Sequence, residues 1–204
     1  MRKPVIGVTG PIASGKTTVA RAIAGRGGAL LDCDALAHRA LEDPVVRWRL
    51  ASAFGPEILT ASGRVSRKRL REAAFASERS LARLNAIIRP RVRAIIEDAV
   101  RRGKARADYI VLDAVLLFRY RFRFKIDFAV AVRAPAGKRL ERIVKRDGVS
   151  RAEARRIMER QRGLERDWKR ADAVIDTGAP LADVRREARR LREVILATGC
   201  GARR

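Results

Sequence analysis

The segment from Gly10 to Thr17 has the residue types and the spacing of a phosphate-binding loop. Its sequence, GPIASGKT, fits the pattern of a glycine, four variable residues, and then Gly-Lys-Thr. The glycines permit a tight loop whose N–H groups converge on phosphate oxygens, and the helix that follows presents its positive end. Lys16 would span the terminal phosphates of ATP, and the Thr17 hydroxyl would bind Mg²⁺.

The surroundings of this loop are the ones that the pattern requires. An apolar run at 5–8 predicts a buried strand before it, and the periodicity at 17–24 predicts a helix after it. A chance match is the alternative, and these flanking elements argue against it. We expect the nucleotide to contact Gly10, Pro11, Ile12, Ala13, Ser14, Gly15, Lys16, Thr17 and Thr18.

Two carboxylates, Asp32 and Asp34, follow the second apolar run at 29–31. The carboxyl ends of parallel strands open the ligand crevice of such a sheet. One carboxylate can hold hydrated Mg²⁺ while the other orients or deprotonates an acceptor hydroxyl. The alternative is that one aspartate caps a helix that begins near Ala35. Because His38 is the only histidine, proton transfer falls to a carboxylate, a lysine or water.

Strands that alternate with helices must position these residues. Short apolar runs predict five strands, at 5–8, 29–31, 109–112, 128–132 and 173–175. This alternation predicts a parallel sheet with right-handed crossovers, and hence a three-layer α/β fold.

Between Asp34 and Arg102 the patterns are only helical. Helix starts are expected at Asp43-Pro44, Ser66 and Ser77, and a break at Pro90. Later helices are expected from near Pro135, from a capping box at Ser150 and Glu153 to about Gln161, and from Leu181 to Ala197.

The composition indicates one compact chain with a strongly basic surface. The 204 residues carry a formal net charge of +24, which favours polyanionic partners such as nucleotides, phosphorylated substrates, nucleic acid or anionic membranes. Arginine predominates along the whole sequence, and a genome-wide arginine bias explains this equally well. No apolar run is long enough to span a bilayer, and Cys33 and Cys200 are expected to remain thiols. We therefore expect a cytoplasmic protein.

Several motifs in order resemble the dephospho-CoA kinase family over nearly the whole chain. The phosphate loop is followed by Asp32-Cys33-Asp34, as at the opening of that family. Further similarities lie at Phe54-Gly55, Ile58-Leu59, Gly63, Arg69 to Phe75, Leu84-Asn85, Pro90, Leu116-Leu117-Phe118, Arg142 through Gly148, Gln161, Ala171-Asp172, Val174-Ile175-Asp176 and Gly178.

The resemblance implies an α/β, three-layer P-loop NTPase fold with a parallel five-stranded sheet. It implies a single kinase domain, residues 1–204, with its core at 1–33, 105–135 and 166–204. A helical acceptor-binding insertion would occupy about 34–104, and a helical lid about 136–165.

The implied reaction transfers the γ-phosphate of ATP to the ribose 3′-hydroxyl of dephospho-CoA. Asp34 is then the expected base, and Asp32 binds Mg²⁺ through water. Arg142 and Arg146, one turn apart, would close with the lid over the transferring phosphoryl group and the adenine side of ATP. The alternative for this arginine-rich segment is a merely solvated helix face.

Four positions depart from the family pattern, namely Arg89, Val115, Arg119 and Thr177. Most would lie around the acceptor, so two alternatives stay open. One is a kinase of the same fold with another nucleoside or nucleotide acceptor, and the other is a nucleic-acid-binding homologue that has lost turnover.

The segment 119–125 alternates basic and aromatic residues and bears on the second alternative. On a strand it would place three aromatic rings on one face and four cations on the other, as RNA-binding surfaces do. We favour an amphipathic edge whose rings enter the core while its cations stay in water.

Overall fold

The computed structural model describes residues 2–161, 163 and 169–198. The chain forms two compact units. The first comprises the residues up to Asp32 together with those from Val100 onward, and the second comprises Cys33–Ala99. No helix in the described part of the chain is long and apolar enough to cross a membrane.

The first unit contains a sheet of five parallel strands, as predicted. The strand order is β2-β3-β1-β4-β5, so β1 lies at the centre, between β3 and β4. The strands are β1 (Val5–Thr9), β2 (Gly28–Asp32), β3 (Tyr109–Asp113), β4 (Phe128–Arg133) and β5 (Ala173–Asp176).

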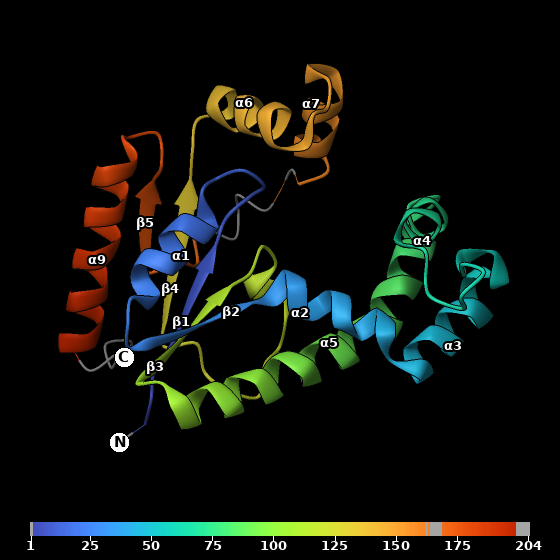
Figure 1. The fold of residues 1–204 in the computed structure, drawn as a ribbon, viewed down its shortest axis with the longest axis horizontal. Coiled ribbons are helices and arrows are strands. Elements are labelled where there is room, and N and C mark those ends of the chain that lie inside the picture. The colour runs from blue at the N-terminus through green and yellow to red at the C-terminus, as the bar shows by residue number, and fades with distance from the viewer. Residues whose placement is uncertain (1, 162, 164–168, 199–204) are drawn as a thin grey trace. The chain divides into compact units, whose positions relative to one another are not determined.

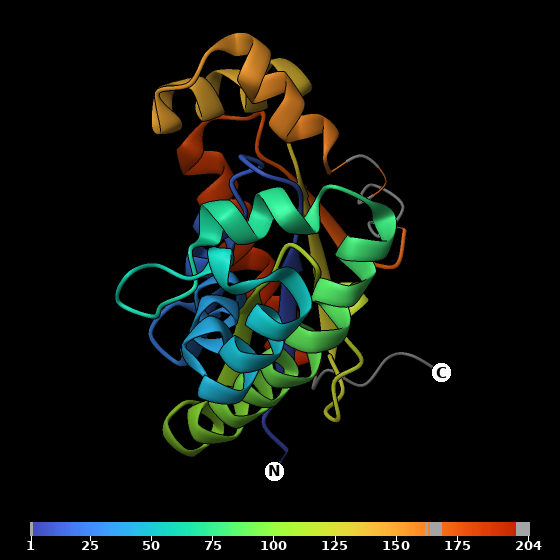
Figure 2. The ribbon, with the colours of Figure 1, turned by 90° about the vertical axis from the view of Figure 1, so that its right-hand side faces the viewer.

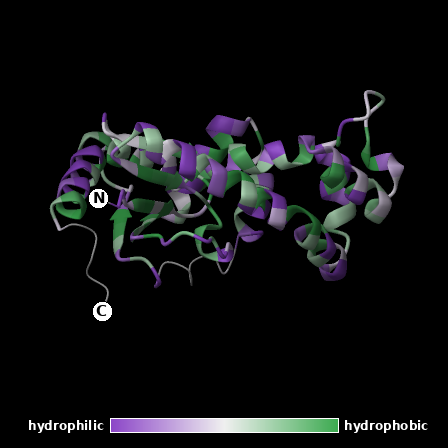
Figure 3. Cartoon of the chain, turned by 90° about the horizontal axis from the view of Figure 1, so that it is seen from below, coloured by the Kyte–Doolittle hydropathy of each residue, from purple (hydrophilic) through white to green (hydrophobic). Residues whose placement is uncertain are grey.

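Helices cover both faces of this sheet, which confirms the three-layer fold. On one face, α1 (Lys16–Ala24) packs with α9 (Leu181–Ala197) over buried residues such as Ile6 and Val111 (Figure 1). On the other face, a side chain at Gly103 in the last turns of α5 would collide with Ile110. Figure 3 shows hydrophobic strands beside helices of mixed polarity, the pattern that layered packing requires.

Tyr109 at the start of β3 fixes the end of α1. Its ring is 3% exposed, and its hydroxyl lies 2.9 Å and 2.7 Å from the carbonyl oxygens of Ile23 and Ala24. Burial raises the pKa of this phenol above its ordinary value of 10.0, so the hydroxyl remains a donor at neutral pH.

Two helices of the first unit, α6 (Ala136–Asp147) and α7 (Arg151–Glu159), occupy the segment predicted to be a lid, which is called the lid below. They pack against each other (Figure 2), with Ile143 and Ala154 fully buried between them. The Ser150 hydroxyl accepts a hydrogen bond from the Glu153 backbone N–H at 3.1 Å, which confirms the predicted helix start.

The second unit is helical, as predicted. Its elements are α2 (Cys33–Arg39), the 3₁₀ turn Ala40–Glu42, α3 (Pro44–Phe54), the 3₁₀ turn Pro56–Ile58, α4 (Arg67–Ala74) and most of α5 (Glu78–Arg106). The Asp43 carboxylate accepts from two N–H groups at the start of α3. The Ser66 hydroxyl caps α4 in the same manner. Ser77 precedes α5, so all three expected starts are confirmed.

The predicted break at Pro90 is wrong, because Pro90 lies inside α5, a continuous helix of 29 residues. An interior proline lacks one helical N–H and costs about 3 kcal/mol. Apolar side chains lie on both sides of it: Ile87 and Ile88 pack on the core of the second unit, and Val92 and Ile96 are buried. Their burial, at about 1.5–3 kcal/mol for each fully buried side chain, outweighs the cost of the proline.

Candidate active site

The phosphate loop connects the central strand β1 to α1, where the sequence places it. Gly15 caps α1 in the left-handed conformation, with φ of 84°, and Gly10 has φ of 154°. A Cβ atom at Gly10 would lie 2.3 Å from the Val132 carbonyl oxygen, so only glycine fits there. Thr18 lies in the first turn of α1, whose N-terminal end faces the loop.

Asp113, the last residue of β3, binds both side chains that end the motif. Its carboxylate lies 2.5 Å from Lys16 Nζ and accepts a hydrogen bond from Thr17 Oγ1 at 2.6 Å. Asp113 is 2% exposed, so these are partly desolvated contacts. A threonine hydroxyl beside a carboxylate is the oxygen donor set that Mg²⁺ takes in P-loop proteins, and the residues therefore fit the ion.

Asp113 is a candidate functional residue that is not among the site residues predicted from the sequence. The signal was present: four apolar residues at 109–112 precede this aspartate, next to the strand that leads into the phosphate loop. In P-loop proteins such a carboxylate binds Mg²⁺ together with the threonine of the loop.

The two predicted carboxylates occupy different units. Asp32 ends β2 directly opposite Asp113 in the parallel register, so both lie at the carboxyl edge of the sheet. Asp34 lies in the first turn of α2, which begins at Cys33 rather than near Ala35. Cys33 is buried, and Cys200 lies outside the described residues.

Side chains of the lid and of Gln161 form hydrogen bonds with the backbone of the phosphate loop. The Ile12 N–H donates to Gln161 Oε1 at 2.6 Å, and Arg139 Nε donates to the Ile12 carbonyl oxygen at 3.0 Å. Arg142 Nη1 donates to the Ala13 carbonyl oxygen at 3.1 Å. These contacts hold Ala13 at φ of 58°, a left-handed conformation that is unfavourable for a residue with a Cβ atom.

Apolar contacts also join the lid to the phosphate loop. Ile12 and Ala13, two variable positions of the motif, pack against the lid cluster of Leu140, Ile143 and Ala154. The motif pattern leaves these positions free, so it could not indicate that they bind the lid.

Of the two arginines expected in the lid, the structure brings only Arg142 to the loop. Arg146 forms a bidentate pair with its neighbour Asp147, at 2.7 Å and 2.8 Å, and its side chain is 59% exposed. Their hydrogen bonds raise the pKa of Arg146 and lower the pKa of Asp147.

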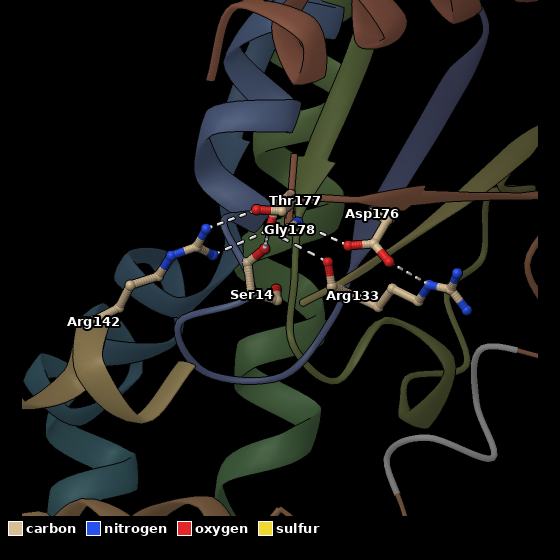
Figure 4. A network of polar contacts seen from close by, with 6 residues as sticks. All are labelled: Ser14, Arg133, Arg142, Asp176, Thr177 and Gly178. Atoms are coloured by element: carbon tan, nitrogen blue, oxygen red, sulfur yellow. Dashed lines mark hydrogen bonds and ion pairs between the residues drawn. The ribbon is translucent and has the colours of Figure 1, made fainter. Parts of the chain in front are cut away.

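The four departures from the family pattern lie in distinct places. Thr177 is 5% exposed and contacts both the phosphate loop and Arg142 (Figure 4). The Val115 carbonyl oxygen accepts from Thr9 Oγ1 at 3.1 Å. Arg119 is exposed in the 3₁₀ turn Leu117–Arg119, and Arg89 is exposed on α5 within the second unit. Thr177 therefore touches the nucleotide-binding loop directly.

The basic and aromatic segment 119–125 is not a strand. Its three rings are half-buried and stack on one another, with centroid separations of 5.5 Å for Tyr120 and Phe122 and 4.7 Å for Phe122 and Phe124. The intervening cations are exposed, as predicted, whereas the rings, which were expected to enter the core, are only half-buried. Because the three rings stack on one another, less of their ring surface is open to nucleic acid bases, which stack on exposed ring faces.

The second unit contains a cavity of about 490 Å³. It is lined by His38, Leu41, Glu42, Arg47, Arg64, Val65 and Arg67. With three guanidinium groups and one carboxylate, its lining favours an anionic ligand.

Comparisons with known proteins agree with this geometry. The family model of dephospho-CoA kinase matches residues 4–183. The chain is 35% identical over 192 residues to a dephospho-CoA kinase of Bacillus licheniformis, covering 92% of this chain and 94% of that protein. It is 37% identical over 190 residues to one of Corynebacterium diphtheriae, with the same coverage.

Solved structures have the same fold. A crystal structure of TT1252 from Thermus thermophilus matches with a TM-score of 0.79 and 32% identity, covering 97% of this chain and 98% of that one. A dephospho-CoA kinase from Campylobacter jejuni matches with a TM-score of 0.60 and 23% identity, covering 95% and 97%. The phosphate loop, its buried aspartate and the extent of these similarities lead to one conclusion: the chain belongs to the dephospho-CoA kinase family.

Proposed function

We propose that this protein transfers the γ-phosphate of ATP to the ribose 3′-hydroxyl of dephospho-CoA, which forms CoA and ADP. The main support is that Lys16 and Thr17, which end the phosphate loop, both contact the carboxylate of Asp113. The chain also belongs to the dephospho-CoA kinase family. The arrangement supplies the cation, the metal-binding oxygens and the loop that phosphoryl transfer requires.

In the proposed reaction, Asp34 is the general base. The bond between the 3′-oxygen and the γ-phosphorus forms as the bond from that phosphorus to the bridging β,γ-oxygen breaks. The hydroxyl proton passes to the Asp34 carboxylate, and ADP leaves. This role is supported by the position of Asp34, two residues after Asp32 at the end of β2.

The residues proposed to hold Mg²⁺ are Thr17 and Asp113, with Asp32 binding it through water. When bound with ATP, Mg²⁺ neutralises charge on the β- and γ-phosphates. In this proposal, Lys16 releases Asp113 and binds the terminal phosphates of ATP instead. The N–H groups from Ala13 to Thr17 donate hydrogen bonds to phosphate oxygens.

The lid and the helical unit supply the remaining groups in this proposal. Arg142 already contacts the phosphate loop, and we propose that it binds the ATP phosphates from this position. Arg146 would bind them only after its ion pair with Asp147 breaks. The basic cavity of the second unit supports a role for that unit in binding dephospho-CoA, whose diphosphate is anionic.

Asp34→Asn tests the assignment of the base. The variant is expected to lower kcat for dephospho-CoA phosphorylation by roughly a hundredfold or more, because an amide cannot accept the hydroxyl proton. Its Kd for ATP, measured by calorimetry without acceptor, should remain unchanged. ADP release with dephospho-CoA, adenosine, AMP or no acceptor gives the rates.

The matched control is Asp183→Asn, which removes the same charge from an exposed site on α9. An unchanged kcat in Asp34→Asn would contradict the role of Asp34. Wild-type protein that binds ATP but releases no additional ADP with dephospho-CoA would contradict the proposed function itself.

A further inference from the structure

The hydroxyl of Thr177 joins three parts of the nucleotide site. It donates a hydrogen bond to the Ser14 carbonyl oxygen at 2.6 Å, and it accepts one from Arg142 Nη1 at 3.0 Å. The Thr177 carbonyl oxygen accepts a second bond from Arg142, at 2.7 Å from Nη2 (Figure 4). The phosphate loop, the lid and the turn after β5 therefore meet at one side chain.

Packing fixes this hydroxyl in one position. A Cβ atom at Gly15 would lie 3.1 Å from the Thr177 methyl group, so the methyl group sits closely over the glycine of the loop. The Thr177 N–H donates to the Arg133 carbonyl oxygen at 2.9 Å, which ties the backbone to the end of β4. A β-branched side chain held on two sides has little rotamer freedom, so its hydroxyl is preorganised.

Arg142 keeps its charge available in this arrangement. Its three acceptors are neutral oxygens, those of Ala13, Thr177 Oγ1 and the Thr177 backbone. Within the described part of the chain it has no carboxylate partner, whereas Arg146, one turn further along α6, is paired with Asp147. A guanidinium held by neutral groups beside a phosphate loop retains its attraction for a phosphate.

We propose that Thr177 is a positioning residue, which holds Arg142 over the phosphate loop in the orientation that meets the ATP phosphates. Its hydroxyl accepts from the arginine while it donates to the loop, so the lid arginine and the loop are aligned before ATP binds. This inference rests on the proposed function, because it assigns Arg142 to the phosphates of ATP.

The test uses two substitutions that separate the hydroxyl from the shape of the side chain. Thr177→Val keeps the branched shape and removes the hydroxyl, and it is expected to raise the Kd for MgATP by roughly tenfold. Thr177→Ser keeps the hydroxyl and removes the methyl group, and its Kd should stay within about twofold of the wild-type value. Calorimetry with MgATP and no acceptor measures both, and the KM for dephospho-CoA should not change.

A double-mutant cycle with Arg142→Ala distinguishes positioning from a merely structural role. If Thr177 acts through Arg142, Thr177→Val should have little further effect on Kd once Arg142 is removed. An unchanged Kd in Thr177→Val would overturn the proposal, as would an equal loss with and without Arg142. Since no acceptor is present, wild-type ATP binding without turnover of dephospho-CoA would count against the proposed function alone.

Discussion

At the scale of single residues, Asp113 organises the phosphate site. One buried carboxylate orients the lysine and the threonine of the motif, the two side chains that we propose bind the terminal phosphates and Mg²⁺. The charge pair also keeps Lys16 from being left as an isolated, partly buried cation.

Asp113→Asn is expected to weaken the use of Mg²⁺. An amide is a poorer Mg²⁺ ligand than a carboxylate, and it leaves Lys16 without an anionic partner. The Mg²⁺ concentration for half-maximal ADP release should rise, and kcat should fall by at least about tenfold. A magnesium titration of wild type, Asp113→Asn and the Asp183→Asn control measures this, and identical titration curves would contradict the role of Asp113.

Residue identities alone predicted part of this site. Gly10, Gly15, Lys16 and Thr17 can be predicted as phosphate-binding residues because phosphate binding requires their spacing. Asp113 was missed because a strand that ends in an aspartate has no unusual spacing. Thr177 was noted only as a departure, since a contact between positions 163 residues apart leaves no local pattern.

At the scale of elements, strands and capped helix starts were predicted well, because both depend on neighbouring residues. Asp43, Ser66 and Ser150 each accept a backbone N–H two or three residues ahead. The break at Pro90 was predicted wrongly because the competing term, burial of apolar residues along α5, is tertiary.

Pro90→Ala is therefore expected to stabilise the protein. The substitution restores one helical hydrogen bond at an exposed position and removes the steric cost of the ring, with an expected gain of about 1–3 kcal/mol. The control is Pro44→Ala, at the first turn of α3, where proline is well tolerated and no gain is expected.

Urea unfolding followed by circular dichroism measures both proline variants. A higher midpoint for Pro90→Ala alone is the predicted result. A lower midpoint would mean that the proline stabilises α5, for example through a bend that its packing requires.

At the scale of the whole molecule, a basic chain carries a phosphate loop in one compact unit and a cavity lined by three arginines in the other. Both proposed substrates are polyanions, so a net charge of +24 favours their approach without any further partner. The fold class could be predicted from alternating strands and helices. The contacts of the lid with Ile12 and Ala13 could not, because they depend on packing between segments far apart in the sequence.

The central claim is that the acceptor hydroxyl belongs to dephospho-CoA. The most direct test is mass spectrometry of the product after incubation with dephospho-CoA, Mg²⁺ and ATP that carries ¹⁸O in its γ-phosphate. The expected product is one labelled phosphate heavier than dephospho-CoA, co-elutes with CoA, and gives fragments that place the phosphate on the ribose. An unmodified dephospho-CoA pool, in a sample that binds ATP, would contradict it.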